Sequence, residues 1–346
     1  MKNWLLLSIV VSLFLCGASA VHAAQVGTER IVQGTVTRIV HQDAQSQTVD
    51  VVVDGKTYKT QTGSLDMVRK QIYQPGDEVL VSLITQPDGS SLAYIKEYVR
   101  TKQLIVLFIL FFIGVAVVAR KKGIFSVLAM IGGFFVLFLY TLPAIMSGAD
   151  PVNTSLITAC VLIPTTFYVA HGFNKKTHVA VVSSLLVMII VIVLSLFWIQ
   201  WANLTGLATD EASQLAVMAK GVFDMRSILL ASIIIGSIGI LDDITVSQVA
   251  IVQELQAVAK TNNKSEIFFR AMKIGGDHIT SMVNTLVLVY VGAALPLFLI
   301  YVKNPQPFGQ LIQYEVIAEE IIRSLIGSIG LVVSVPLSTF IASRVF

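Results

Sequence analysis

The chain has 346 residues and a net charge of +3, and 55% of its residues are hydrophobic but only 13% charged. Charged residues make up about a quarter of an ordinary soluble domain. This composition, with a mean hydropathy of +0.79, is therefore that of a membrane protein with several spans. The basic residues lie between apolar runs and form no patch, which argues against nucleic acid as a partner.

The N-terminus has the pattern of a secretory signal. An early lysine precedes an apolar run from Leu5 to Leu15, and small residues follow up to Ala24. We predict a signal peptide over residues 1–24, with an uncleaved anchor helix as the alternative. Lipidation of Cys16 is disfavoured, because Leu15 stands where a small residue is expected.

Residues 26–100 alternate between apolar and polar side chains, as β-strands do. Asp54-Gly55 between two β-rich runs predicts a hairpin, and further turns are expected at 74–77 and 86–91. About five short strands in so short a segment favour a small all-β, OB-like domain. We expect it to be a docking or spacer module, because the aromatic and basic stripe of a nucleic-acid-binding OB fold is not apparent.

The remainder, residues 103–346, is predicted to be a transmembrane helical domain. A helix needs roughly 20 residues to cross the hydrocarbon, and seven runs are apolar on all sides: about 103–119, 125–146, 154–171, 179–201, 227–248, 279–302 and 321–343. The predicted fold class is thus an α-helical multi-span membrane protein with a small extracytoplasmic OB-like domain. A polar stretch that starts at Thr209 predicts a short interfacial helix.

Basic residues mark alternate loops, which we expect to be cytoplasmic. They lie at 120–122, at 175–176, at 260–273 and at Arg344, whereas the opposite loops are acidic or neutral. The signal peptide agrees, because it places the N-terminal domain outside. The C-terminus is therefore expected in the cytoplasm.

The fifth predicted span carries two adjacent carboxylates, Asp242 and Asp243, about four turns from its start. Charges at this depth are costly, and two neighbouring carboxylates do not both ionise easily. Helical spacing places Asp243, Ser247 and Glu254 on one face. We interpret this face as a candidate proton or ion pathway, in which the pair loads and releases protons.

The sixth span has a second polar stripe, which we expect to face the first one and to line a hydrated path from the cytoplasm. It consists of Asp277, His278, Ser281, Asn284 and Thr285, with Asp277 and His278 at the mouth. Two alternatives stay open. The Asp pair only hydrogen-bonds neighbouring helices, or the span is misplaced and the pair lies nearer the surface.

Glycines are expected to let helices approach closely. Gly236 and Gly239 lie in span five, and Gly327 and Gly330 in span seven, where the letters GSIG recur. His171 and His278 each lie at the end of a span, where a histidine is more often an interfacial residue than a ligand.

The chain resembles the YibE/F-like family of bacterial multi-pass membrane proteins over nearly its whole length. The residues that carry the resemblance are "YIKEYVR", "GSIGILDDITVSQVAIVQEL" and "AMKIGGDHITSMVNTLVLVYVGAALPLF". The resemblance implies the bacterial cell membrane as location, and a paired family subunit or a homo-oligomer as partner. Family members commonly have Met in place of Asp242, ahead of an Asp like Asp243, which gives Asp243 the greater weight.

A weaker likeness concerns "GILDDITVSQVAIVQELQ", which is similar to the fourth membrane span of proton-driven exporters of the resistance-nodulation-division class and of SecD/SecF. There a mid-span carboxylate couples proton flow to movement of an outer domain. This chain differs in having no large outer domain between spans, a long loop before span five and no basic partner in mid-membrane.

We therefore expect a permease or exporter component, coupled to protons through Asp243 and Asp242. The alternative is a non-transporting envelope assembly factor or sensor whose β domain binds a partner. No enzymatic motif is apparent. One mature cysteine, Cys160, excludes a disulfide within the chain or a cysteine-based metal site, and no cofactor is predicted.

Overall fold

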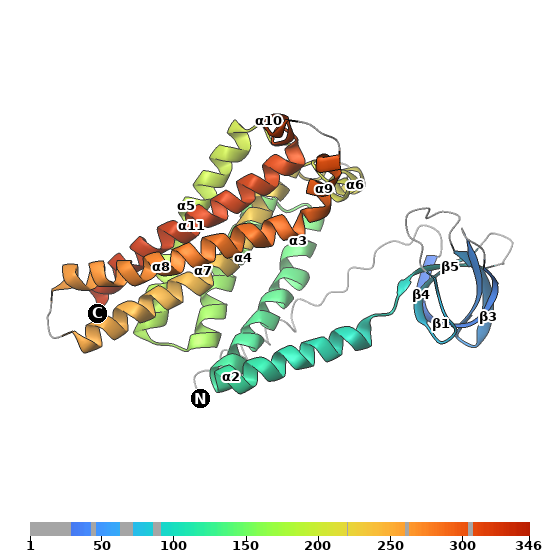
Figure 1. The fold of residues 1–346 in the computed structure, drawn as a ribbon, viewed down its shortest axis with the longest axis horizontal. Coiled ribbons are helices and arrows are strands. Elements are labelled where there is room, and N and C mark those ends of the chain that lie inside the picture. The colour runs from blue at the N-terminus through green and yellow to red at the C-terminus, as the bar shows by residue number, and fades with distance from the viewer. Residues whose placement is uncertain are drawn as a thin grey trace. The chain divides into compact units, whose positions relative to one another are not determined.

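The computed structural model describes residues 29–42, 46–62, 72–85, 91–219, 221–259, 263–303 and 307–346. They form an N-terminal antiparallel sheet followed by helices (Figure 1). The chain divides into two compact units, one of Ser19–Val117 and one that holds Val118–Phe346, and each is described by itself. The predicted signal peptide and residues 86–90 of a predicted turn lie outside the described residues.

The sheet has the strand order β3-β2-β1-β4-β5, with every neighbouring pair antiparallel. The strands are β1 (Glu29–Gln42), β2 (Gln47–Val53), β3 (Lys56–Thr62), β4 (Glu78–Thr85) and β5 (Ser91–Tyr98). The first half of β1 pairs with β4 and its second half with β2. The edge strands β3 and β5 approach within 8 Å between Cα atoms, so the sheet curls towards closure.

The predicted alternation produces the core of the sheet, because every second residue of a strand points to the same face. The fully buried valines are Val36, Val49, Val51, Val79 and Val81. The predicted hairpin is confirmed: Asp54 (φ 49°) and Gly55 (φ 78°) are both left-handed, as a type I′ turn requires.

The helical elements follow in chain order, and side-chain caps begin several of them. They are α2 (Thr101–Val136), η1 (Leu137–Thr141), α3 (Leu142–Met146), α4 (Pro151–His171), α5 (Lys175–Trp201), α6 (Asp210–Ala219), α7 (Met225–Val258), α8 (Lys264–Ala293), α9 (Leu295–Lys303), α10 (Phe308–Leu311) and α11 (Glu315–Val345). The helix predicted after Thr209 is confirmed as α6, and the Thr209 hydroxyl accepts from the Ala212 N–H at 3.2 Å.

Five helical segments of the described chain are long and apolar enough to cross a membrane, against seven predicted spans. The first segment, Thr101–Met146, contains both of the first two predicted spans. It is interrupted at Arg120, whose φ of 51° and ψ of −134° are not helical. The sixth predicted span falls on α8 and α9 and is not among the five, because α8 starts with polar turns and the helix stops at Ala294, before Pro296.

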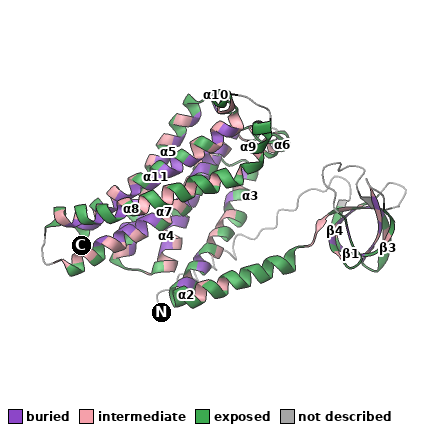
Figure 2. Ribbon diagram, in the orientation of Figure 1, coloured by how far each residue is buried: buried purple, intermediate pink, exposed green. Residues whose placement is uncertain are grey.

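In the helical unit α7 packs against α4, α5, α8 and α11, and α11 also packs against α5 and α8 (Figure 1). Figure 2 shows buried residues along these helices, whereas α2 is exposed over most of its length. The side chains of α2 are mostly not covered by other described parts of the chain. The centre of the bundle is therefore α7, the helix that carries the two aspartates.

Candidate functional site

Asp242 and Asp243 lie near the middle of α7 and line a pocket of about 350 Å³. The pocket is formed by side chains of α2, α4 and α7. Its polar lining consists of Asp242, Asp243 and Ser247 from α7, Thr166 and His171 from α4, and Ser126 from α2. Ala129, Met130, Ala170 and Val246 supply the apolar part of the wall.

Neither carboxylate forms a hydrogen bond or an ion pair within the part of the chain that the structure describes. Their neighbours behave differently. The Thr245 hydroxyl contacts the Ser184 hydroxyl at 2.7 Å, and Gln248 bonds two other helices. The side chains that join α7 to its neighbours are thus the buried ones, and the aspartates face the pocket.

Two histidines lie close to the aspartate pair. His171 is the last residue of α4, and His278 belongs to the polar stripe of α8. His171 lines the pocket directly. His278 of α8 is near enough for an electrostatic interaction with Asp243. The sequence predicted His171 to be an interfacial residue and gave no sign of Thr166 and Ser126, because only the arrangement of α2 and α4 around the pocket brings them to the pair.

The level of the pocket within the bundle follows from the helix ends. Thr166, Ala170 and His171 occupy the last two turns of α4. Ser184, which meets Thr245, lies nine residues or about 14 Å into α5. The aspartates therefore lie between the middle of the bundle and the end where α4 connects to α5.

The polar stripe of α8 does not face the stripe of α7. Most of it lies on the exposed face of α8, namely Asp277, Ser281, Asn284 and Thr285. The opposite face, with Ala271 and Gly275 buried, packs against α7 and α11. A Cβ on Gly275 would lie 2.5 Å from Val335 Cγ1, so small residues, not polar ones, select the packing face. The predicted path between two facing stripes is thus not formed in this structure.

Glu254, the last member of the predicted α7 face, lies two turns beyond Ser247 and is exposed. It interacts electrostatically with Lys176 in the first turn of α5. Among the described residues, no group of three or more His, Cys, Asp or Glu side chains is placed to hold a metal ion.

The predicted packing glycines differ in what surrounds them. A Cβ on Gly330 would lie 2.7 Å from Val191 Cγ2, and one on Gly327 would lie 3.0 Å from Ile240 Cδ1. At Gly236 the nearest atom is the Tyr290 hydroxyl at 3.9 Å, and Gly239 has nothing within 4 Å. The close approach to α5 and α7 thus occurs at the two glycines of α11.

Gln248 is a structural residue that sequence reasoning missed. It is fully buried, and its Nε2 donates to the Ala271 carbonyl of α8 at 3.0 Å and to the Thr339 hydroxyl of α11 at 2.7 Å. The signal in the sequence is an amide side chain one turn after Thr245 in an otherwise apolar run.

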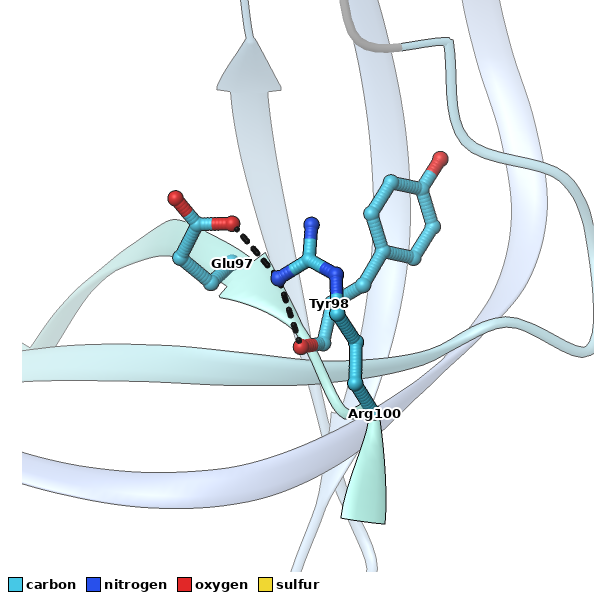
Figure 3. A network of polar contacts seen from close by, with 3 residues as sticks. All are labelled: Glu97, Tyr98 and Arg100. Carbon is cyan, nitrogen blue, oxygen red and sulfur yellow. Dashed lines mark hydrogen bonds and ion pairs between the residues drawn. The ribbon is translucent and has the colours of Figure 1, made fainter. Parts of the chain in front are cut away.

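The sheet unit has a groove of its own, of about 560 Å³, where β5 leads into α2. Gly76, Glu78, Tyr98, Arg100 and Lys102 are among its lining residues. Arg100 donates to the Glu97 carboxylate at 3.0 Å and to the Tyr98 carbonyl at 3.5 Å, as Figure 3 shows. Lys102 is paired with Glu78 at 2.6 Å, so the charges of this groove are largely neutralised within it.

Five long apolar helical segments and an open polar pocket against the middle of α7 define a multi-span membrane protein. The family model for YibE/F-like protein matches residues 107–346. The chain belongs to the YibE/F-like family. No curated protein and no solved structure matches the chain.

Proposed function

We propose that the protein is a permease or exporter component of the bacterial cell membrane, coupled to protons through Asp243 and Asp242. The observation that carries this proposal is the pocket, in which both carboxylates lie without a hydrogen-bond or ion-pair partner among the described residues. A carboxylate that only joins helices has such a partner in the bundle.

The chemistry of the pair supports proton transfer. Two adjacent carboxylates in a partly desolvated pocket resist simultaneous ionisation, so one of them holds a proton more readily than an isolated Asp does. Protons then enter and leave as the access to the pocket changes, which is how intramembrane carboxylates act in proton relays. His171, in the same pocket, is a second proton-accepting group.

We propose the following topology. α2 forms two spans that meet at Arg120, and α8 with α9 forms a sixth, which gives seven. The basic loops face the cytoplasm, and the five-stranded sheet lies outside after cleavage of a signal peptide at residues 1–24. The closing five-stranded sheet supports an OB-like domain.

The remaining proposals concern chemistry and partners. We propose no enzymatic activity and no cofactor, and the lipid bilayer with a second subunit, either a copy of this chain or a paired relative, as partners. The likeness of the Asp242 region to resistance-nodulation-division and SecD/SecF spans stays a prediction. His171 lines the pocket and His278 interacts electrostatically with Asp243, and we propose them as the basic partners of the pair.

A second candidate function is that of a non-transporting assembly factor or sensor. It is favoured by one observation, the groove of the sheet unit, which lies beside the start of the first apolar helix. In that case deletion of residues 26–100 abolishes function, whereas replacement of either aspartate does not.

Proton flux into proteoliposomes tests the leading proposal. Under an imposed membrane potential, a trapped pH dye reports the flux of the wild type and of Asp242→Asn/Asp243→Asn. We expect the double variant to lose the flux while its melting temperature stays within a few degrees of the wild type. Asp277→Asn is the matched control, since Asp277 is exposed on the other face of α8, and it should keep the flux. Undiminished flux in the double variant contradicts the proposal.

A further inference from the structure

Three basic groups from three helices lie near one another where α4 connects to α5, and one of them, His171, lines the pocket. Lys122 of α2 lies one turn before the pocket residue Ser126 and therefore on the same helix face. His171 of α4 lines the pocket. Lys176, in the first turn of α5, interacts electrostatically with both Lys122 and His171.

Within the described residues neither Lys122 nor Lys176 forms an ion pair. Glu254 interacts electrostatically with Lys176 without forming an ion pair. Like charges brought together by folding repel one another, so an anionic group placed between the two lysines is favoured.

The pocket thus has two carboxylates in its wall and basic groups near it. Asp242 and Asp243 line it from the middle of α7 and His171 from the last turn of α4. Lys122 and Lys176 are not lining residues, but both interact electrostatically with His171. Lys122 lies about 6 Å along α2 from the pocket residue Ser126, a distance that a lysine side chain can span. The volume of the pocket, about 350 Å³, corresponds to roughly a dozen water molecules.

We propose that the pocket binds a small zwitterionic solute, with its ammonium group at Asp242 and Asp243 and its anionic group at Lys122 and Lys176. The inference rests on the proposed function and names its substrate class. A proton and an ammonium group compete for the same carboxylates, so loading of protons releases the solute. The volume allows a solute of up to about ten non-hydrogen atoms.

Three compounds with the same four-carbon skeleton test the two charged groups one at a time. They are 4-aminobutyrate, which carries both groups, n-butylamine, which carries only the ammonium group, and butyrate, which carries only the carboxylate. Binding to the full chain in lipid nanodiscs is measured as the shift of the melting temperature with ligand concentration. We expect 4-aminobutyrate to bind most tightly, n-butylamine more weakly and butyrate weakest. Glycine and 6-aminohexanoate then show which separation of charges fits.

Charge-neutral variants locate the two ends of the solute. In Lys122→Gln/Lys176→Gln the preference for 4-aminobutyrate over n-butylamine should fall by about two- to fivefold, the range for losing a partly exposed charge pair. The matched control is Lys121→Gln/Lys175→Gln, which removes the neighbouring lysines of the same two turns and should leave the preference unchanged. Asp242→Asn/Asp243→Asn should weaken both amine ligands.

Equal affinity for 4-aminobutyrate and n-butylamine, with no response to the lysine variants, overturns the inference. The inference is also overturned if no compound of the series binds, or if butyrate binds with the same affinity to the wild type and to the aspartate variants. These failures are distinct from failure of the proposed function, because the proton flux is measured without the solute. A flux that depends on the aspartates then remains valid while the substrate class is rejected.

Discussion

At the scale of single residues, the amide of Gln248 contributes contacts that the neighbouring aspartates do not. It bonds α8 and α11 at once and is fully buried. Gln248→Ala removes both bonds and leaves a cavity, so we expect a loss of about 1–3 kcal/mol in the free energy of unfolding. Denaturant titration in detergent measures it. Gln253→Ala, on the exposed surface of the same helix, should change the stability by less than about 0.5 kcal/mol.

Tyr98 ties the sheet to the segment before β4, because its hydroxyl donates to the Ile72 carbonyl at 2.8 Å. Burial, with a contribution from the Asp77 carboxylate, raises the pKa of Tyr98 above its ordinary value of 10.0, although Arg100 opposes this. A tyrosine with a raised pKa stabilises the fold in its neutral form. Its contribution is complete below about pH 10 and is lost as the pH rises through the folded-state pKa.

Tyr98→Phe should therefore lower the stability of the sheet by about 0.5–1.5 kcal/mol at pH 7. Above about pH 10 the wild type should lose stability faster than the variant. The urea midpoint, followed through the methyl NMR signals of the core valines, measures both. Tyr94→Phe is the control, since Tyr94 makes no hydrogen bond within the described chain. An equal response of wild type and Tyr98→Phe to pH contradicts the assignment.

Sequence reasoning at this scale identified the aspartates but not their surroundings. A charged pair inside an apolar run is visible in one helix alone. His171 and Thr166 join the pair through the packing of α4 against α7, and Ser126 of α2 lines the same pocket; no periodicity of α7 encodes this arrangement. His171 lies at the end of α4, as expected, and also lines the pocket.

At the scale of elements, α8 shows how one helix face is selected. Its polar face was expected to meet α7, but the small residues Ala271 and Gly275 allow the closer approach. Apolar and small side chains gain dispersion contacts at short helix separations, and the polar stripe remains on the other side. Polarity alone therefore did not predict orientation, whereas strand alternation did predict the buried face of β2.

Two adjacent glycines of α8 provide a matched test. Gly275→Ala places a Cβ 2.5 Å from Val335 Cγ1, so we expect overpacking to destabilise the bundle by about 1–3 kcal/mol. Gly276 has nothing within 4 Å, so Gly276→Ala should be neutral or stabilise by up to about 1 kcal/mol. Thermal unfolding in detergent compares them. If both changes have the same effect, the close approach at Gly275 is not supported.

At the scale of the whole molecule, composition predicts a membrane protein, and long apolar helices are present. The number of spans is harder to predict, because α2 continues through Arg120 with only a local interruption and α8 is partly polar. Hydropathy defines apolar length, but it does not show where a helix bends or whether a polar helix enters the bilayer.

The proposed orientation is tested by cysteine labelling. In a chain with Cys16→Ser and Cys160→Ser, single cysteines replace Lys56 in the sheet or Lys175 between α4 and α5. A membrane-impermeant maleimide should label the Lys56→Cys chain in intact cells with a permeable outer envelope. It should label the Lys175→Cys chain only after the inner membrane is opened. The reverse pattern inverts the topology.

The central claim is that the carboxylates of the pocket carry protons. The most direct measurement is the initial rate of proton flux into proteoliposomes for wild type, Asp242→Asn, Asp243→Asn and the double variant. We predict a reduced rate in each single variant, with the larger loss at Asp243, and no flux above empty liposomes in the double variant. A double variant that is as active as the wild type would show that these carboxylates carry no protons.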